Sequence, residues 1–152
     1  MQVLNAFFYR QTLFLVIQYL RLGSKHNRGD TPMTSAVQEK INRINKGYAF
    51  AKKNLPDSIT AYLQFSAQAK KDDALSAKTK ELVALGIALA VRCNGCLLYH
   101  MKSCKKLGVT REEILNVFEM AVMMGGGPVF TSAAELEEAM EEFYPLPVEE
   151  KK

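Results

Sequence analysis

Two cysteines and a histidine on one short segment are the side chains best suited to chemistry in this sequence of 152 residues. Cys93 and Cys96 are separated by two residues, and His100 lies four positions after Cys96. Cysteine reacts as the thiolate, and a helix that begins near Asn94 would favour a thiolate at Cys93 through its free N–H groups and its dipole. The i, i+4 spacing places His100 on the same helical face as Cys96, where the imidazole can exchange a proton with the thiol. The segment therefore predicts a dithiol redox couple with a base beside it.

The same residue types also bind metal ions, and helix geometry bears on that alternative. The four possible ligands extend over eleven residues of one helix, which is roughly 16 Å at about 1.5 Å per residue. They are Cys93, Cys96, His100 and Cys104. Zinc lies only about 2.0 to 2.3 Å from its ligands, so one straight helix cannot close a four-ligand site. A three-ligand site or a site between subunits stays open. We expect no metal and no cofactor, and we expect Cys104 to be a buried, unreactive thiol.

Glu81 is a candidate partner for His100. If the helices that carry the two residues are antiparallel, the Glu81 carboxylate lies beyond His100, in the order sulfur, imidazole, carboxylate. A glutamate near the start of a helix is also favoured by the helix dipole alone. The residue by itself is therefore compatible with a proton relay and with a purely local role.

The elements that must position these side chains are all predicted to be helices, because no segment shows sustained period-two alternation. We predict an all-α fold, a single-domain bundle of about six helices, with the CxxC motif at the N-terminus of a central helix. Cap residues, proline and glycine delimit the helices. Ser76 is expected to cap the third helix, and Thr110 with Glu113 is expected to form a capping box at the start of the fifth. The predicted helices cover residues 35–54, 56–71, 76–91, 93–107 and about 110–122, and a sixth runs through Val129 and Met140.

Three expectations concern burial. The second helix is expected to bury Ile59, Leu63 and either Phe65 or Ala67. The run 82–91 is apolar on all sides, which predicts a central helix buried all round. Three methionines are expected to lie in the core or at a subunit interface, with an apolar substrate pocket as the alternative. They are Met120, Met123 and Met124.

The distribution of charge argues against nucleic-acid binding. The net charge is +4, from 20 basic and 16 acidic residues. Four of those basic residues and one of the acidic residues precede Met33, so the remainder of the chain is nearly neutral. A nearly neutral body lacks the basic surface that nucleic acid requires, and we expect no nucleic-acid partner.

The N-terminal segment differs from the rest of the chain. We expect residues 1–32 to be an extension outside the fold and residues 33–152 to form the domain. Val3–Leu22 is rich in apolar residues, but Arg10 and Arg21 interrupt it, which argues against a signal peptide or a membrane span. Three clustered cysteines are also not the framework of a disulfide-stabilised secreted domain. The sequence thus predicts a cytoplasmic location and no membrane partner.

The motif residues also resemble a known family. Glu81, eleven residues, Cys93-x-x-Cys96, three residues and His100 match the E-x11-C-x2-C-x3-H signature of the alkyl hydroperoxidase D group. That group belongs to the carboxymuconolactone decarboxylase superfamily, and the resemblance extends over roughly residues 34–143. It implies an all-helical subunit that assembles into a homo-oligomer, either a trimer or a hexamer. It also implies an alkyl hydroperoxide reductase, a peroxiredoxin-type antioxidant enzyme that depends on the CxxC motif.

The resemblance further implies the roles of the site residues. Cys96 would attack an organic hydroperoxide, Cys93 would resolve the sulfenic acid as a disulfide, and His100 with Glu81 would relay protons. The helix dipole by itself favours Cys93 as the nucleophile, so the order of attack stays open. A thiol or lipoyl-type reductant would complete the cycle.

One departure and two alternatives accompany this interpretation. The best-studied branch of the group has a further relay histidine where this chain has Gly95, which predicts weaker turnover or a different substrate. The founding decarboxylases of the superfamily act on a lactone by proton transfer and do not depend on the CxxC motif. A non-catalytic helical oligomer that acts as a scaffold is the third possibility.

Overall fold

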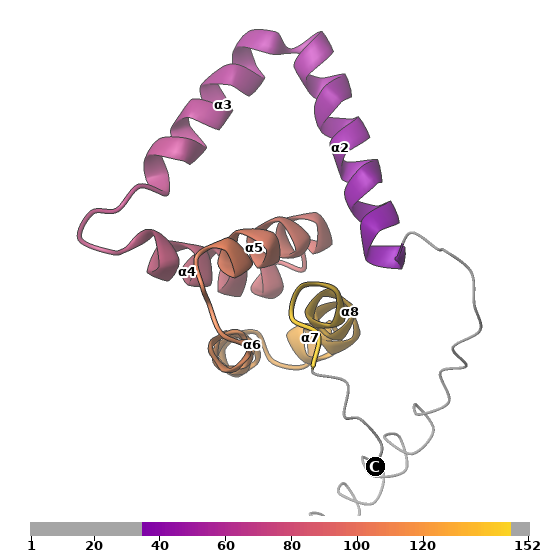
Figure 1. Ribbon diagram of the computed structural model, residues 1–152, viewed down its shortest axis with the longest axis vertical. Coiled ribbons are helices and arrows are strands. Elements are labelled where there is room, and N and C mark those ends of the chain that lie inside the picture. The colour runs from indigo at the N-terminus through magenta and orange to yellow at the C-terminus, as the bar shows by residue number, and fades with distance from the viewer. Residues whose placement is uncertain (1–34, 147–152) are drawn as a thin grey trace, which may run out of the picture. The chain divides into compact units, whose positions relative to one another are not determined.

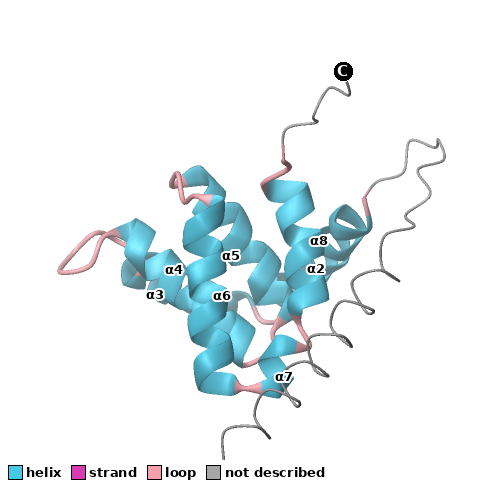
Figure 2. Ribbon diagram, turned by 90° about the horizontal axis from the view of Figure 1, so that it is seen from below, coloured by secondary structure: helices cyan, strands magenta, loops and turns pink. Residues whose placement is uncertain are grey.

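The computed structural model describes residues 35–146, and the regular structure of this segment is entirely helical (Figure 2). This confirms the all-α fold that the sequence predicts. Six helices have eleven or more residues, and one further helix is a single turn. The helices are α2 (Ala36–Asn54), α3 (Pro56–Ala69), α4 (Ala77–Ala90), α5 (Asn94–Lys106), α6 (Arg111–Gly125), α7 (Gly127–Phe130) and α8 (Ala133–Phe143). The extension expected over 1–32 lies outside the described residues.

The helix boundaries follow from local hydrogen bonding. The Ser76 hydroxyl accepts a hydrogen bond from the N–H of Thr79 at 3.1 Å and so caps α4. Thr110 and Glu113 form a reciprocal capping box at the start of α6. Gly108 has a φ of +67°, the left-handed conformation that glycine adopts at low cost, and the chain turns there after α5.

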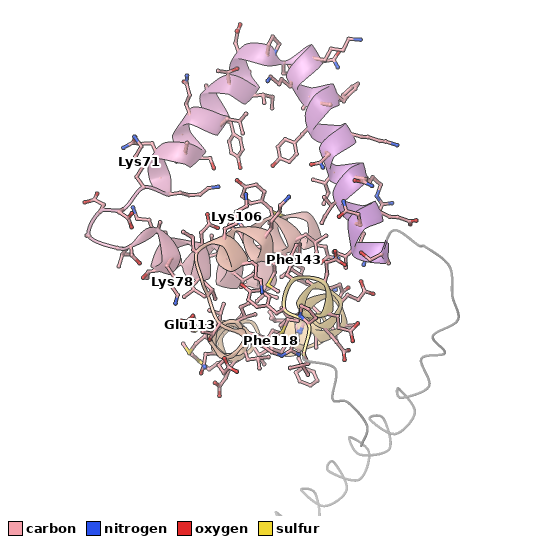
Figure 3. The ribbon with its side chains drawn as sticks, in the orientation of Figure 1. Lys71, Lys78, Lys106, Glu113, Phe118 and Phe143 are labelled. Carbon is pink, nitrogen blue, oxygen red and sulfur yellow. A yellow bond between two sulfur atoms is a disulfide. The ribbon has the colours of Figure 1, made fainter. Side chains whose placement is uncertain are left out.

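The core lies where α4, α5, α6 and α8 pack against one another (Figure 1). Gly86 brings α4 close to α6, since a Cβ atom at this position would lie 3.3 Å from Cγ1 of Val117. An ion pair of 2.9 Å between Lys78 of α4 and Glu113 of α6 joins the same two helices (Figure 3). The largest fully buried side chains are Leu85, Leu89, Met101, Ile114, Val129 and Cys104.

The second helix differs from its prediction, because α3 contains no buried residue. Leu63 is 46 % exposed and Phe65 is 72 % exposed, Ala67 is exposed, and Ile59 is only partly buried. The helix that packs against α3 is α2, which meets it at an angle near Leu55 (Figure 1). The expected burial was wrong because helical spacing identifies an apolar face but does not supply the neighbour that covers it.

Two further predictions need correction. Helix α4 is not buried all round, since Val83 and Ile87 are more than half exposed. The single last helix is divided into α7 and α8. At the division, the Thr131 hydroxyl donates to the carbonyl of Pro128 at 2.9 Å, a side-chain bond that competes with helix continuation. Among the described residues, no helix is both long and apolar enough to cross a membrane.

Candidate active site

The two motif cysteines lie at the start of α5, directly after a tight turn from α4. Arg92 has a φ of 56°, and the N–H of Cys93 donates to the carbonyl of Ala88 at 2.9 Å. Cys93 is the N-cap residue of α5, and its sulfur accepts the N–H of Cys96 at 3.3 Å. The side chains of Cys93 and Cys96 are joined in a disulfide, with Cα atoms 5.2 Å apart. Cys96 is exposed and Cys93 is partly buried, so a molecule from solvent has better access to Cys96.

The short turn between α4 and α5 makes these helices antiparallel neighbours and brings Glu81 to His100. Oε2 of Glu81 lies 2.6 Å from Nδ1 of His100. Glu81 is 4 % exposed, and the His100 side chain is 17 % exposed. A carboxylate on Nδ1 fixes the orientation of the imidazole and leaves Nε2 available for a second proton partner. The structure thus contains the contact that the antiparallel arrangement predicts, whereas the catalytic roles of these residues stay a prediction.

Two residues that the sequence analysis did not select also lie at the Glu81–His100 pair. Nζ of Lys70 is 3.8 Å from Oε1 of Glu81 and donates a hydrogen bond of 2.8 Å to the Tyr99 hydroxyl. The Tyr99 ring meets the His100 ring edge to face, with ring centres 5.3 Å apart. No spacing rule connects Lys70 to the motif, because it follows α3 and reaches the site only through the tertiary fold.

The third cysteine has a different environment. Cys104 is fully buried in the core, one helical turn after His100. Burial raises the pKa of its thiol to about 11, and the carboxylates of Glu81 and Glu113 act in the same direction. Cys104 therefore stays a thiol at neutral pH and is a poor nucleophile.

Gly95 lies beneath α2. A Cβ atom built on Gly95 would meet the Cδ1 atom of Ile44 at 3.5 Å, an ordinary van der Waals contact. The position at which the best-studied related branch has a histidine is therefore adjacent to an apolar side chain of α2. A larger side chain at residue 95 would have to share this space with Ile44.

The arrangement provides two sulfur atoms that can exchange two electrons, and an imidazole with a carboxylate that can accept and release protons. Within residues 35–146, no three or more histidine, cysteine, aspartate or glutamate side chains are grouped as they would be to hold a metal ion. The disulfide and the Glu81–His100 pair place thiol and acid–base groups around the start of α5.

Comparison with known sequences places this arrangement in a family. The model of the carboxymuconolactone decarboxylase family matches residues 56–139, more than half of the chain. The chain belongs to this family. The match runs from the start of α3 into α8 and includes Glu81, both motif cysteines and His100.

Solved structures of the family agree with this assignment. A carboxymuconolactone decarboxylase family protein from Legionella pneumophila is 41 % identical, with a TM-score of 0.68. The similarity covers 72 % of this chain and 98 % of that protein. A family member from Thermotoga maritima, for which an antioxidative role has been suggested, is 27 % identical with a TM-score of 0.53. That match covers 56 % of this chain and 88 % of the other.

Similar sequences without a known activity also occur. A protein from Cupriavidus necator is 29 % identical over 96 residues, which cover 63 % of this chain and 85 % of that protein. A protein from Methanocaldococcus jannaschii is 32 % identical over 99 residues, which are 64 % of this chain and 94 % of the other. Both are uncharacterised. Carboxymuconolactone decarboxylase family members thus share this chain's helical domain, while the reaction must be inferred from the site.

Proposed function

We propose that this protein is a CxxC-dependent alkyl hydroperoxide reductase of the carboxymuconolactone decarboxylase family. One observation carries the proposal: the buried Glu81 carboxylate contacts His100, which lies one helical turn after the exposed Cys96, and Cys96 is paired with Cys93. A thiol peroxidase needs this set of groups, because the attacking sulfur must lose a proton and the leaving oxygen must gain one.

The proposed reaction balances with the groups at hand. The Cys96 thiolate attacks the terminal oxygen of the hydroperoxide, the O–O bond breaks, and an alcohol leaves with a proton supplied through His100. Cys96 is then a sulfenic acid. The Cys93 sulfur attacks the Cys96 sulfur, the S–O bond breaks, water leaves, and the disulfide forms. An external dithiol, of the thiol or lipoyl type, returns two electrons by exchange with this disulfide.

Three features support Cys96 as the attacking sulfur. It is more exposed than Cys93, it shares a helical face with His100, and the resemblance to the alkyl hydroperoxidase D group assigns it this role. The N–H donated to the Cys93 sulfur favours a thiolate there as well, which suits a resolving cysteine. The antioxidative role suggested for the Thermotoga maritima relative is consistent with the same chemistry.

Peroxide consumption by variants tests this proposal. We expect Cys96→Ser to abolish the consumption of an organic hydroperoxide in the presence of a dithiol reductant. Cys93→Ser should instead permit one oxidation and accumulate a sulfenic acid at Cys96, visible by intact mass. Cys104→Ala, which removes the buried thiol, is the matched control and should keep full turnover. Undiminished consumption by Cys96→Ser would end the proposal.

A second function is favoured by the Glu81–His100 pair itself, because proton transfer on a lactone needs the pair and not the sulfur atoms. This is the decarboxylase-type chemistry for which the family is named. It would be recognised as lactone turnover that survives loss of both Cys93 and Cys96 but disappears in His100→Ala. The disulfide between the two cysteines has no part in that reaction, which is why we place it second.

We also propose that the protein acts as a homo-oligomer, a trimer or a hexamer, in the cytoplasm. Apolar side chains are exposed on three separate helices, and such surfaces in a soluble domain mark interfaces. They are Leu63 and Phe65 of α3, Val83 and Ile87 of α4, and Met120, Met123 and Met124 of α6. Sedimentation of the wild type should give the mass of three or six chains, and Ile87→Lys should lower it. A wild type that sediments as a monomer at micromolar concentration would contradict the proposal.

A further inference from the structure

Lys70 joins the end of α3 to the Glu81–His100 pair. Its ammonium group lies 3.8 Å from Oε1 of Glu81, the carboxylate oxygen that His100 does not use. The same group donates to the Tyr99 hydroxyl at 2.8 Å and lies 4.4 Å from the centre of the Tyr99 ring. Lys70 therefore contacts the carboxylate on one side and the aromatic neighbour of the imidazole on the other.

The loop after α3 is fixed in a way that brings Lys70 to this place. Nζ of Lys80, on α4, donates to the backbone carbonyl of Lys71 at 2.6 Å. The backbone N–H of Ala77 donates to Oδ1 of Asp72 at 2.7 Å. Both bonds tie the residues directly after Lys70 to the start of α4, the helix that carries Glu81. The position of Lys70 is thus set by the loop.

Glu81 is buried, so a positive charge near it interacts strongly with its carboxylate. Glu81 is 4 % exposed and the Lys70 side chain is 28 % exposed, so water screens their interaction less than it screens a surface pair. Helix α5 places His100 on the carboxylate and the neutral thiol of Cys104 near it. On α6, which also packs against α4, the charge of Glu113 is paired with Lys78. Lys70 is thus the cation that the α3 end brings to this buried carboxylate.

We propose that Lys70 is a positioning residue for the relay. It holds the Glu81 carboxylate with Oε2 toward His100, and it adds a positive charge beside the pair. That positive charge, together with an imidazole held on the same helical face as Cys96, favours the thiolate of Cys96. The inference deepens the proposed peroxidase, because Cys96 is there the attacking sulfur.

Alkylation of the reduced protein tests this inference without any peroxide. The rate of iodoacetamide labelling at Cys96, located by peptide mass spectrometry, is followed against pH in a Cys93→Ser background. In Lys70→Met, the pH of half-maximal rate should rise, so that labelling at pH 7 slows about threefold to tenfold. The plateau rate at high pH, which reports access to the sulfur, should not change. Lys70→Arg, which retains the charge, should restore the wild-type profile.

Two further variants make the test specific. Lys71→Met removes the neighbouring lysine, at the α3 end in Figure 3, which has no ion pair within the described part of the chain. It should label as the wild type does. Tyr99→Phe removes the hydroxyl that holds the ammonium group and should shift the profile in the same direction by less. An unchanged profile in both Lys70→Met and Tyr99→Phe would overturn the inference. A wild type that consumes no peroxide would contradict the proposed function. The labelling experiment would still test the role of Lys70, because it uses no peroxide.

Discussion

Helices α3 and α4 have the same length, 14 residues each, and opposite surroundings. Helix α4 buries Glu81, Leu85, Ala88 and Leu89, whereas α3 buries none of its residues. Both have apolar residues at helical spacing, so the difference lies in their neighbours. Helix α4 packs against α5 and α6, while α3 has α2 alone as a substantial neighbour. Glu81 thus lies on α4, the helix that contacts within the same subunit hold in place.

The difference in burial between α3 and α4 predicts a large difference in how much each helix contributes to stability. Leu85 is completely buried, and Leu85→Ala should lower the free energy of unfolding by about 2 to 5 kcal/mol through the cavity that it leaves. Leu63→Ala, the same change on α3, should cost about 0.5 kcal/mol or less in a dilute, dissociated sample. Urea denaturation at low protein concentration measures both. Equal losses would show that α3 is packed as firmly as α4.

The buried carboxylate of α4 predicts a second effect, on activity. Glu81→Gln keeps the size of the side chain but removes the negative charge that holds His100 in place, and it should slow peroxide consumption about a hundredfold. Glu119→Gln, on an exposed position of α6, is the matched control and should leave turnover unchanged. Steady-state kinetics with an organic hydroperoxide decide the matter. A Glu81→Gln enzyme with wild-type kcat would remove the carboxylate from the mechanism.

The buried thiol predicts a smaller effect at alkaline pH. A cysteine in the unfolded chain ionises near pH 9, whereas burial raises the pKa of Cys104 to about 11. Between these values the unfolded state has lost a proton that the folded state retains, so stability falls as pH rises through this window. The loss amounts to about 2 kcal/mol at most.

Comparison with a variant isolates that contribution. Cys104→Ala should flatten the decline in unfolding free energy between pH 9 and 11. Tyr144, whose pKa is raised to about 12 chiefly by burial, should then account for the decline that remains above pH 10. A wild type and a Cys104→Ala variant with parallel profiles from pH 9 to 11 would contradict this assignment.

Features encoded by short-range interactions could be predicted from the sequence. The cap at Ser76 and the capping box at Thr110 need only neighbouring residues, and both occur as expected. The contact between Glu81 and His100 could also be predicted, because a turn of three residues leaves two helices little choice but to run antiparallel. The fold class followed from the same signals.

Features that depend on distant packing could not be predicted. The approach of Lys70 to Glu81 requires the loop bonds of Lys80 and Asp72, which no helical spacing encodes. The exposure of Val83 could not be predicted either. The sequence shows that a side chain is apolar, but it does not show whether the same chain covers it. Lys70 was missed and the burial of α4 was overestimated for the same reason: both depend on contacts between residues that are distant in sequence.

The absence of any buried residue in α3 has a consequence for kinetics in dilute solution. An isolated helix of about 12 to 15 residues is marginal in water, so α3 amides should exchange with deuterium far faster than those of α4. Association of subunits over α3 would slow that exchange in proportion to occupancy. Lys70 follows this helix but is held by the loop bonds to α4, so its contact with Glu81 should persist while α3 opens.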